Sequence, residues 1–161
     1  MLSGPNSWLR KLFTMGCFAP WATTSIGGPE CFEGYHGLAY RGDSSLLEAH
    51  WLLQLTRIRS YFLRESVSLR TLSLVQLPNL QEIGSNVLGS CPHLRDVYLR
   101  DLPKLATIGL GFAAKCSALR TLKLSRLPAL TVISSYFVSQ CTSLRHVCLV
   151  DLPNLEELVG I

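Results

Sequence analysis

The segment "LRTLKLSRLPALTVISSYFVSQCTS", residues 119–143, is one complete copy of a pattern that recurs every 25 residues along the chain. It starts with L-x-x-L-x-L, continues through a Leu-Pro pair, and carries a cysteine three residues before the next leucine. Three sets of residues keep this period without an insertion: Leu69, Leu94, Leu119 and Leu144; Pro78, Pro103, Pro128 and Pro153; Cys91, Cys116 and Cys141. A fixed period of this length predicts a solenoid of stacked coils. Residues 25 apart are called a column below.

A short strand is predicted near the start of each unit. In residues 119–143, Leu122 and Leu124 alternate with Thr121 and Lys123, as side chains on the two faces of a strand do. Stacked coils would pair these strands into a parallel sheet with the leucines inward. The proline that follows cannot donate to a ladder, so each coil is expected to leave the sheet there.

The rest of each unit is predicted to close the core from the other side. Leu130 and Ile133 supply apolar side chains after the Leu-Pro step, and Phe137 stands in the same column as Val87 and Phe112. We expect the segment around this last column to form a single helical or 3-10 turn. The predicted fold class is therefore α/β, with a short parallel sheet on one face of a solenoid and short helical or 3-10 turns on the other.

These residues resemble the leucine-rich repeat family. The Ile-Gly pairs of "EIGSNVLGSC" (82–91) and "TIGLGFAAKC" (107–116), with a cysteine ahead of the next leucine, are similar to its BspA-type subclass. The resemblance covers Ser68 to the C-terminus, and implies a leucine-rich-repeat solenoid that acts as a binding scaffold. Members of the subclass are frequent among cell-surface adhesins and antigen-like proteins.

The segment "LLQLTRIRSYFLRES" (52–66) also reads as a basic amphipathic helix for a membrane, a partner or a core. Shifted by 75 residues, however, residues 52–69 match 127–144 at nine of eighteen positions. We therefore interpret residues 44–68 as a degenerate capping repeat, in which "SLLE" (45–48) is a capping-box pattern that can start a helix. The expected divisions are an N-terminal tail or irregular cap (1–43), this degenerate unit, and leucine-rich repeats, three full and one incomplete (69–161).

Composition limits the class of protein. The chain has 161 residues, 48% of them apolar and 16% charged, which indicates one folded domain. No apolar run approaches the roughly 18–20 residues that span a bilayer. A net charge of +4 without a concentrated basic segment argues against nucleic-acid binding. The N-terminus has no acidic residue before Glu30, which fits a transit peptide, a poor secretory signal or an ordinary tail.

The cysteines and histidines suggest neither a metal site nor a catalytic site. Same-phase residues of neighbouring coils form a row, so the cysteine column does not converge as a tetrahedral metal site requires. Small buried thiols are the better interpretation, and they slightly favour a reducing cell interior, with the cell surface or an organelle left open. His146 and Cys148 share one strand face without a third orienting group. We expect no catalytic residue, no metal and no cofactor.

The exposed strand face is the candidate partner-binding site. Its residues are Arg70, Arg95, Asp96, Tyr98, Arg120, Lys123, Arg145 and His146. Four of them form what we call the arginine column: Arg70, Arg95, Arg120 and Arg145. This column either keeps the sheet soluble or forms a basic strip for an acidic protein surface or phosphate, with Tyr98 as the expected hot spot.

Protein–protein interaction through this face is the predicted function. A structural subunit, or a fragment of a larger assembly or longer repeat array, is the alternative, and RNA binding through the arginine column is the least favoured. The fourth unit stops at "LPNLEELVGI" (152–161) without its convex turn. Its uncovered apolar edge predicts self-association, a covering partner, or continuation in a longer chain.

Overall fold

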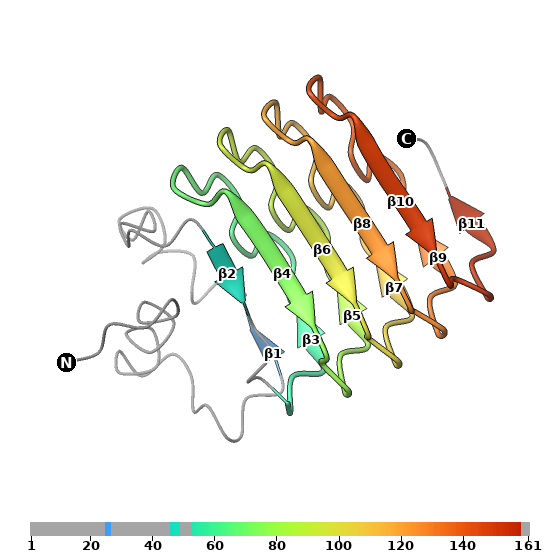
Figure 1. Cartoon of the computed structure of the whole chain (residues 1–161). Coiled ribbons are helices and arrows are strands. Elements are labelled where there is room, and N and C mark those ends of the chain that lie inside the picture. Colours follow the sequence, from blue (N-terminus) through green and yellow to red (C-terminus); the bar gives the residue numbers. More distant parts are fainter. Residues whose placement is uncertain (1–24, 27–45, 49–52, 159–161) are drawn as a thin grey trace, which may run out of the picture.

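The computed structural model describes residues 25–26, 46–48 and 53–158, which form a solenoid of parallel strands (Figure 1). Each regular coil contributes one five-residue strand to a first sheet. The strands of this sheet are β4 (Thr71–Val75), β6 (Asp96–Arg100), β8 (Thr121–Ser125), β10 (His146–Val150) and the shorter β2 (Leu46–Glu48). All pairings are parallel, in the order β10-β8-β6-β4-β2. We call this the long-strand sheet.

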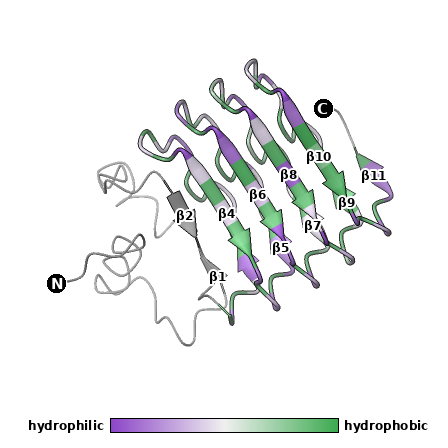
Figure 2. Cartoon of the chain, in the orientation of Figure 1, coloured by the Kyte–Doolittle hydropathy of each residue, from purple (hydrophilic) through white to green (hydrophobic). Residues whose placement is uncertain are grey.

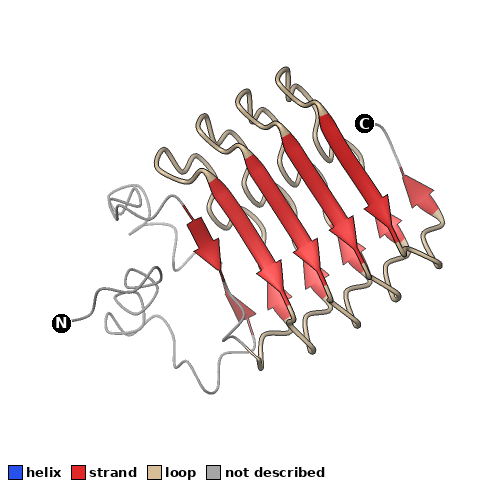
Figure 3. Ribbon diagram, viewed as in Figure 1, coloured by secondary structure: helices blue, strands red, loops and turns tan. Residues whose placement is uncertain are grey.

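A second parallel sheet lies on the other side of the core. Its six two-residue strands are β1 (Ser25–Ile26), β3 (Arg57–Ile58), β5 (Glu82–Ile83), β7 (Thr107–Ile108), β9 (Val132–Ile133) and β11 (Glu157–Leu158), in the order β1-β3-β5-β7-β9-β11. We call it the short-strand sheet. In both sheets, neighbouring strands come from successive coils, as Figure 3 shows. The sequence predicted the first sheet and the inward isoleucines, but not that these isoleucines lie in paired strands.

The core lies between the two sheets. On β6, Val97 and Leu99 point inward and are fully buried, while Asp96, Tyr98 and Arg100 face outward. The same alternation of polar and apolar residues is visible along the long strands in Figure 2. The leucine and isoleucine columns of the central coils are 0–1% exposed, whereas Leu144, Leu152 and Leu155 of the last coil are only partly buried. The apolar core of each coil is therefore covered by the coils on its two sides.

The predicted helical or 3-10 turn on the convex side is wrong. No helix forms within residues 53–158, and alternate residues of the convex segment, such as Asn86, Leu88 and Ser90, have φ near +60°. Right-handed helical residues need negative φ. Amides of this segment instead bond neighbouring coils: Asn86 donates to the carbonyl of Leu110 at 2.7 Å, and Leu88 donates to that of Phe62 at 3.0 Å. Bonds between coils thus replace the i to i−4 bonds of a helix.

The helix start proposed at "SLLE" is also wrong. Leu46–Glu48 is strand β2, which pairs in parallel with Thr71–Ser73 of β4. Strand β4 at the edge of the long-strand sheet offers these residues backbone partners on one side, which outweighs a local capping pattern. In the neighbouring segment, Leu55, Ile58 and Phe62 are no more than 5% exposed. The apolar residues at helix-like spacing therefore lie in the core of a coil and not on the face of a helix.

Tight turns explain the proline column. Leu80 donates to the carbonyl of Leu77 at 3.4 Å, and Leu105 donates to Leu102 at 3.2 Å, which places a proline at the second position of each turn. Proline is favoured there because its φ is already set. The turn is thus the place where each coil leaves the long-strand sheet, as predicted.

Several predictions fall on residues that the structure does not describe. They concern the targeting segment and most of the irregular cap, at residues 1–24 and 27–45. The division into tail, degenerate unit and regular repeats stays a prediction. Among the residues that are described, no helix is long and apolar enough to cross a membrane.

Stacking makes the inward leucines the main source of stability. We expect Leu99→Ala, at a fully buried position of β6, to lower the free energy of unfolding by about 2–5 kcal/mol, because it leaves a cavity between two coils. Urea denaturation followed by circular dichroism would measure it. The outward Thr121→Ala is the control and should cost less than about 1 kcal/mol. Equal losses for the two variants would contradict this account of the core.

Candidate functional site

The outward face of the long-strand sheet carries side chains of mixed chemistry. On β4, β6 and β8 the outward positions hold two or more polar groups each, over inward residues that are at most 1% exposed. Because neighbouring strands are fixed about 4.8 Å apart, these side chains stand at set distances from one another. The sheet is therefore a rigid platform for whatever its outward residues contact.

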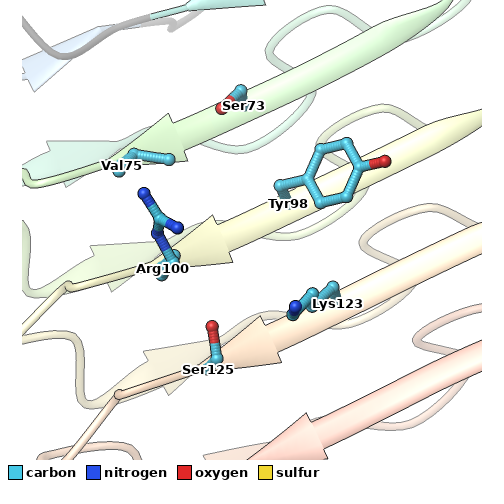
Figure 4. Close-up of a pocket in the computed structure, with 6 residues that line it drawn as sticks. All are labelled: Ser73, Val75, Tyr98, Arg100, Lys123 and Ser125. Carbon is cyan, nitrogen blue, oxygen red and sulfur yellow. The ribbon is translucent and has the colours of Figure 1, made fainter.

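A hollow of about 280 Å³ lies on this face (Figure 4). We call it the strand-face hollow. The residues that line it are Ser73, Val75, Tyr98, Arg100, Lys123 and Ser125. Strand register explains the set, because one row joins Ser73, Tyr98 and Lys123, and the next joins Val75, Arg100 and Ser125. The hollow is thus built by two outward positions on each of three adjacent strands.

Two arginines share one carboxylate beside the hollow. Arg126 donates to Asp101 through Nε at 2.7 Å and through Nη2 at 2.8 Å. The Nε of Arg100 lies 3.3 Å from the same carboxylate. Exposed ion pairs of this kind add little stability, but they restrict where the guanidinium groups can lie. One negative charge between two positive ones leaves this end of the hollow positive.

Tyr98 and Lys123 occupy the other row of the hollow. Partial burial, together with the carboxylate of Asp96, raises the pKa of Tyr98 above its usual value of 10.0. Its hydroxyl therefore stays protonated at neutral pH and can donate a hydrogen bond. Lys123 forms no ion pair with another described residue. Its ammonium is available to an anion at the surface.

Ser125 is the buried polar member of the hollow. Its side chain is 6% exposed, and its Oγ has no hydrogen-bond partner within the described part of the chain. Figure 4 shows this oxygen directed from β8 toward Arg100 on β6. An unpaired buried hydroxyl costs about 1–3 kcal/mol, so natural proteins seldom keep one without a use.

The residues predicted from sequence fall into two groups. Asp96, Tyr98, Lys123 and His146 lie on the outward strand positions, and Tyr98 and Lys123 line the strand-face hollow. The arginine column stands one residue before each long strand, and all four side chains are exposed. The arginine column therefore flanks the sheet and lines no part of the hollow.

Arg100, Ser125 and Val75 are the functional candidates that the sequence prediction missed, whereas Ser73 belongs to the same outward column as the predicted Tyr98 and Lys123. The prediction ended each outward face at the column of Ser73 and Tyr98, although the strand runs two residues further. Extending the alternation from Asp96 through Tyr98 would have reached Arg100. The buried state of Ser125 has no such signal, because it depends on neighbours from the adjacent coils.

The cysteine column is part of the core and of its hydrogen bonding. Cys91 and Cys116 are fully buried, and their thiols donate to the carbonyls of Leu63 and Leu88 in the preceding coil, both at 3.1 Å. Hydrogen bonding with Cys141 lowers the pKa of Cys116, while hydrogen bonding with Cys91 and burial raise it, to about 12 on balance. The Cys116 thiol therefore stays protonated at neutral pH. Within the described residues, no three His, Cys, Asp or Glu side chains are grouped to hold a metal ion.

The comparisons with known proteins add one finding. A family model described as a BspA type leucine-rich repeat region, with 6 copies, matches residues 24–157. Searches of curated proteins and of solved structures gave no match. The matched range includes the whole of the long-strand sheet and the strand-face hollow.

Thiol reactivity should separate the cysteines. At pH 8 we expect iodoacetamide to alkylate Cys148, which is half-buried on the outward face of β10, and to spare Cys91 and Cys116. A thiol with a pKa of about 12 is ionised to only about one part in ten thousand at that pH. Peptide mapping by mass spectrometry would measure the labelling, with urea-unfolded protein as the control. Rapid labelling of Cys116 in the folded protein would contradict the burial and hydrogen bonding of the cysteine column.

Proposed function

Because the chain belongs to the BspA-type leucine-rich repeat family, we propose that it is a non-catalytic scaffold that binds a protein partner through the outward face of the long-strand sheet. Leucine-rich repeats commonly mediate protein interaction, and a solenoid presents a long surface for it. The face includes the outward residues of β4, β6, β8 and β10 and the flanking arginine column.

The contrast between the two sides of the long strands carries this proposal. Inward columns hold only leucine or valine from coil to coil. The outward columns vary; they read Thr71, Asp96, Thr121 and His146; Ser73, Tyr98, Lys123 and Cys148; Val75, Arg100, Ser125 and Val150. If solubility alone determined these positions, small polar residues would suffice. A tyrosine and an arginine, Tyr98 and Arg100, instead stand together on β6, and these two residue types are enriched at recognition surfaces.

Tyr98 is the expected centre of the contact. It lies in the middle strand of the three that form the strand-face hollow. A tyrosine side chain has only two rotatable χ angles, so it offers a large contact area and loses little conformational freedom on binding. Arginines of the arginine column would then form the rim, where charge guides association more than it adds affinity.

A second candidate role is self-association through the last coil. Val147 and Leu149 are 51% and 38% exposed, whereas their counterparts Leu122 and Leu124 are 1% and 0% exposed. On the side of β10 that faces away from β8, no strand lies within the described part of the chain. Such an edge can pair with the same edge of a second copy about a two-fold axis.

The recognition proposal is tested with two variants of the outward face. Affinity capture from the native source would first identify the protein that binds the wild-type chain. We expect Tyr98→Ala to weaken that complex by roughly 2 kcal/mol or more, as hot-spot truncations do. We expect Arg95→Glu with Arg120→Glu to slow association. Calorimetry and surface plasmon resonance would measure the two effects.

Matched controls lie elsewhere on the solenoid. Thr107→Ala changes an outward residue of the short-strand sheet, and Lys115→Glu reverses a charge in a column where Glu65 already stands. Both should bind the partner as the wild type does. Equal loss in the controls would contradict recognition by the outward face. A strongly salt-dependent affinity for RNA that Arg95→Glu abolishes would favour the nucleic-acid alternative instead.

Self-association has its own test. Light scattering at increasing concentration should show dimers of the wild-type chain, and Val147→Lys with Leu149→Lys should shift them to monomers, because the lysines place charge on the exposed edge. Leu110→Lys, at a residue that is 43% exposed on a convex turn, is the control and should not change the dimer fraction. A monodisperse wild-type monomer at high concentration would exclude this role.

A further inference from the structure

The starting point is the unpaired hydroxyl of Ser125. Its Oγ is buried, lines the strand-face hollow, and has no hydrogen-bond partner among the described residues. The residues that would be its neighbours in the register, Arg100 and Val150, offer it no backbone group, because their amides and carbonyls serve the sheet ladder. A ligand bound in the hollow, which Ser125 lines, would supply this hydroxyl with a partner.

The strand-face hollow offers hydrogen-bond donors and no negatively charged acceptor. Its walls contain the guanidinium of Arg100, the ammonium of Lys123, and hydroxyls of Ser73, Tyr98 and Ser125. No carboxylate lines it. Asp101 holds the Nε side of Arg100, and Figure 4 shows the guanidinium extending toward β4. A ligand in this position would meet two positive charges and up to three hydroxyl donors.

The positions of these donors are set before any ligand arrives. Along a strand, outward residues are about 6.8 Å apart, and across strands they are about 4.8 Å apart. The hollow therefore has a floor of about 7 by 10 Å on three strands. That floor is rigid because the inward Leu74, Leu99 and Leu124 beneath it are at most 1% exposed. A floor of this size accommodates the terminal group of one side chain.

We propose that the strand-face hollow binds a phosphorylated side chain of the protein partner, an inference that rests on the recognition function proposed above. A phosphoserine or phosphothreonine carries about −1.5 to −2 charges and three acceptor oxygens. This matches two cations and three hydroxyls. A carboxylate, with one charge and two oxygens, would leave a cation or the Ser125 hydroxyl without a partner.

The direct test uses a small probe and the full chain. N-acetyl-O-phosphoserine amide would be titrated against 15N-labelled protein, with N-acetylglutamate amide in a parallel titration. We expect saturable shifts confined to the amides of residues 73–75, 98–100 and 123–125. We expect the glutamate probe to bind at least roughly tenfold more weakly, because it forms fewer charge-assisted hydrogen bonds.

Variants separate the hollow from the general positive charge. Arg100→Gln should weaken the phosphoserine probe at least roughly tenfold, and Ser125→Ala should weaken it several-fold. Ser125→Ala should also raise the Tm of the free protein, because an unpaired buried hydroxyl is removed, and this shows that the variant folds. Arg95→Gln, in the arginine column outside the hollow, is the matched control and should bind the probe unchanged.

Three results would overturn the inference. They are equal affinity for the two probes, equal weakening by Arg95→Gln and Arg100→Gln, and the absence of saturable shifts at the hollow. Failure of the recognition function is recognised separately. If no partner depends on Tyr98 while the phosphoserine probe still binds at Arg100, the recognition proposal fails and the anion site remains.

Discussion

Hydrogen bonding between coils is the constraint on which the rest of the structure depends. Backbone amides of both sheets, of the Leu-Pro turns and of the convex segment donate to the neighbouring coil; examples are Gln76 to Arg100, Ala106 to Gln81 and Lys115 to Ser139. Within residues 53–158, even the thiols of Cys91 and Cys116 follow this rule. An extra residue within one of these paired segments would shift the register of that coil against both of its neighbours. The 25-residue period is therefore required by the backbone as well as by the leucine core.

The close approach of the coils sets a further limit on the sequence. A Cβ placed on Gly84 would lie 2.5 Å from the amide nitrogen of Ser60, and one on Gly109 would lie 2.6 Å from the backbone of Gly84. The Ile-Gly pairs that marked the repeat thus have a steric reason. Ser134 occupies the same column in the next coil, and nothing in the structure explains why a side chain is accepted there.

Much of this fold follows from local patterns. Leu122 and Leu124 are inward because alternation is a property of any half-buried strand, and Pro128 marks a turn because it cannot donate. The convex turn was not predictable in the same way. Ile108 and Phe112 have the i, i+4 spacing of a helix face, but the ring of Phe112 stacks on that of Phe137 in the next coil, with centroids 5.4 Å apart. For the site, Tyr98 and Lys123 could be identified as outward residues from their position in the unit. The burial of Ser125 and the ion pair of Arg126 with Asp101 depend on residues from adjacent coils, which no single unit reveals.

The strand-face hollow belongs to three neighbouring coils and to none of them alone. Duplication or loss of one 25-residue unit would keep every inward column intact and preserve the ladder, because all coils share the same backbone path. It would nevertheless bring a different set of outward side chains together. A gene that encodes such a chain can therefore change what the protein recognises by changing the number of units, without the destabilising substitutions that a new pocket in a globular core would require.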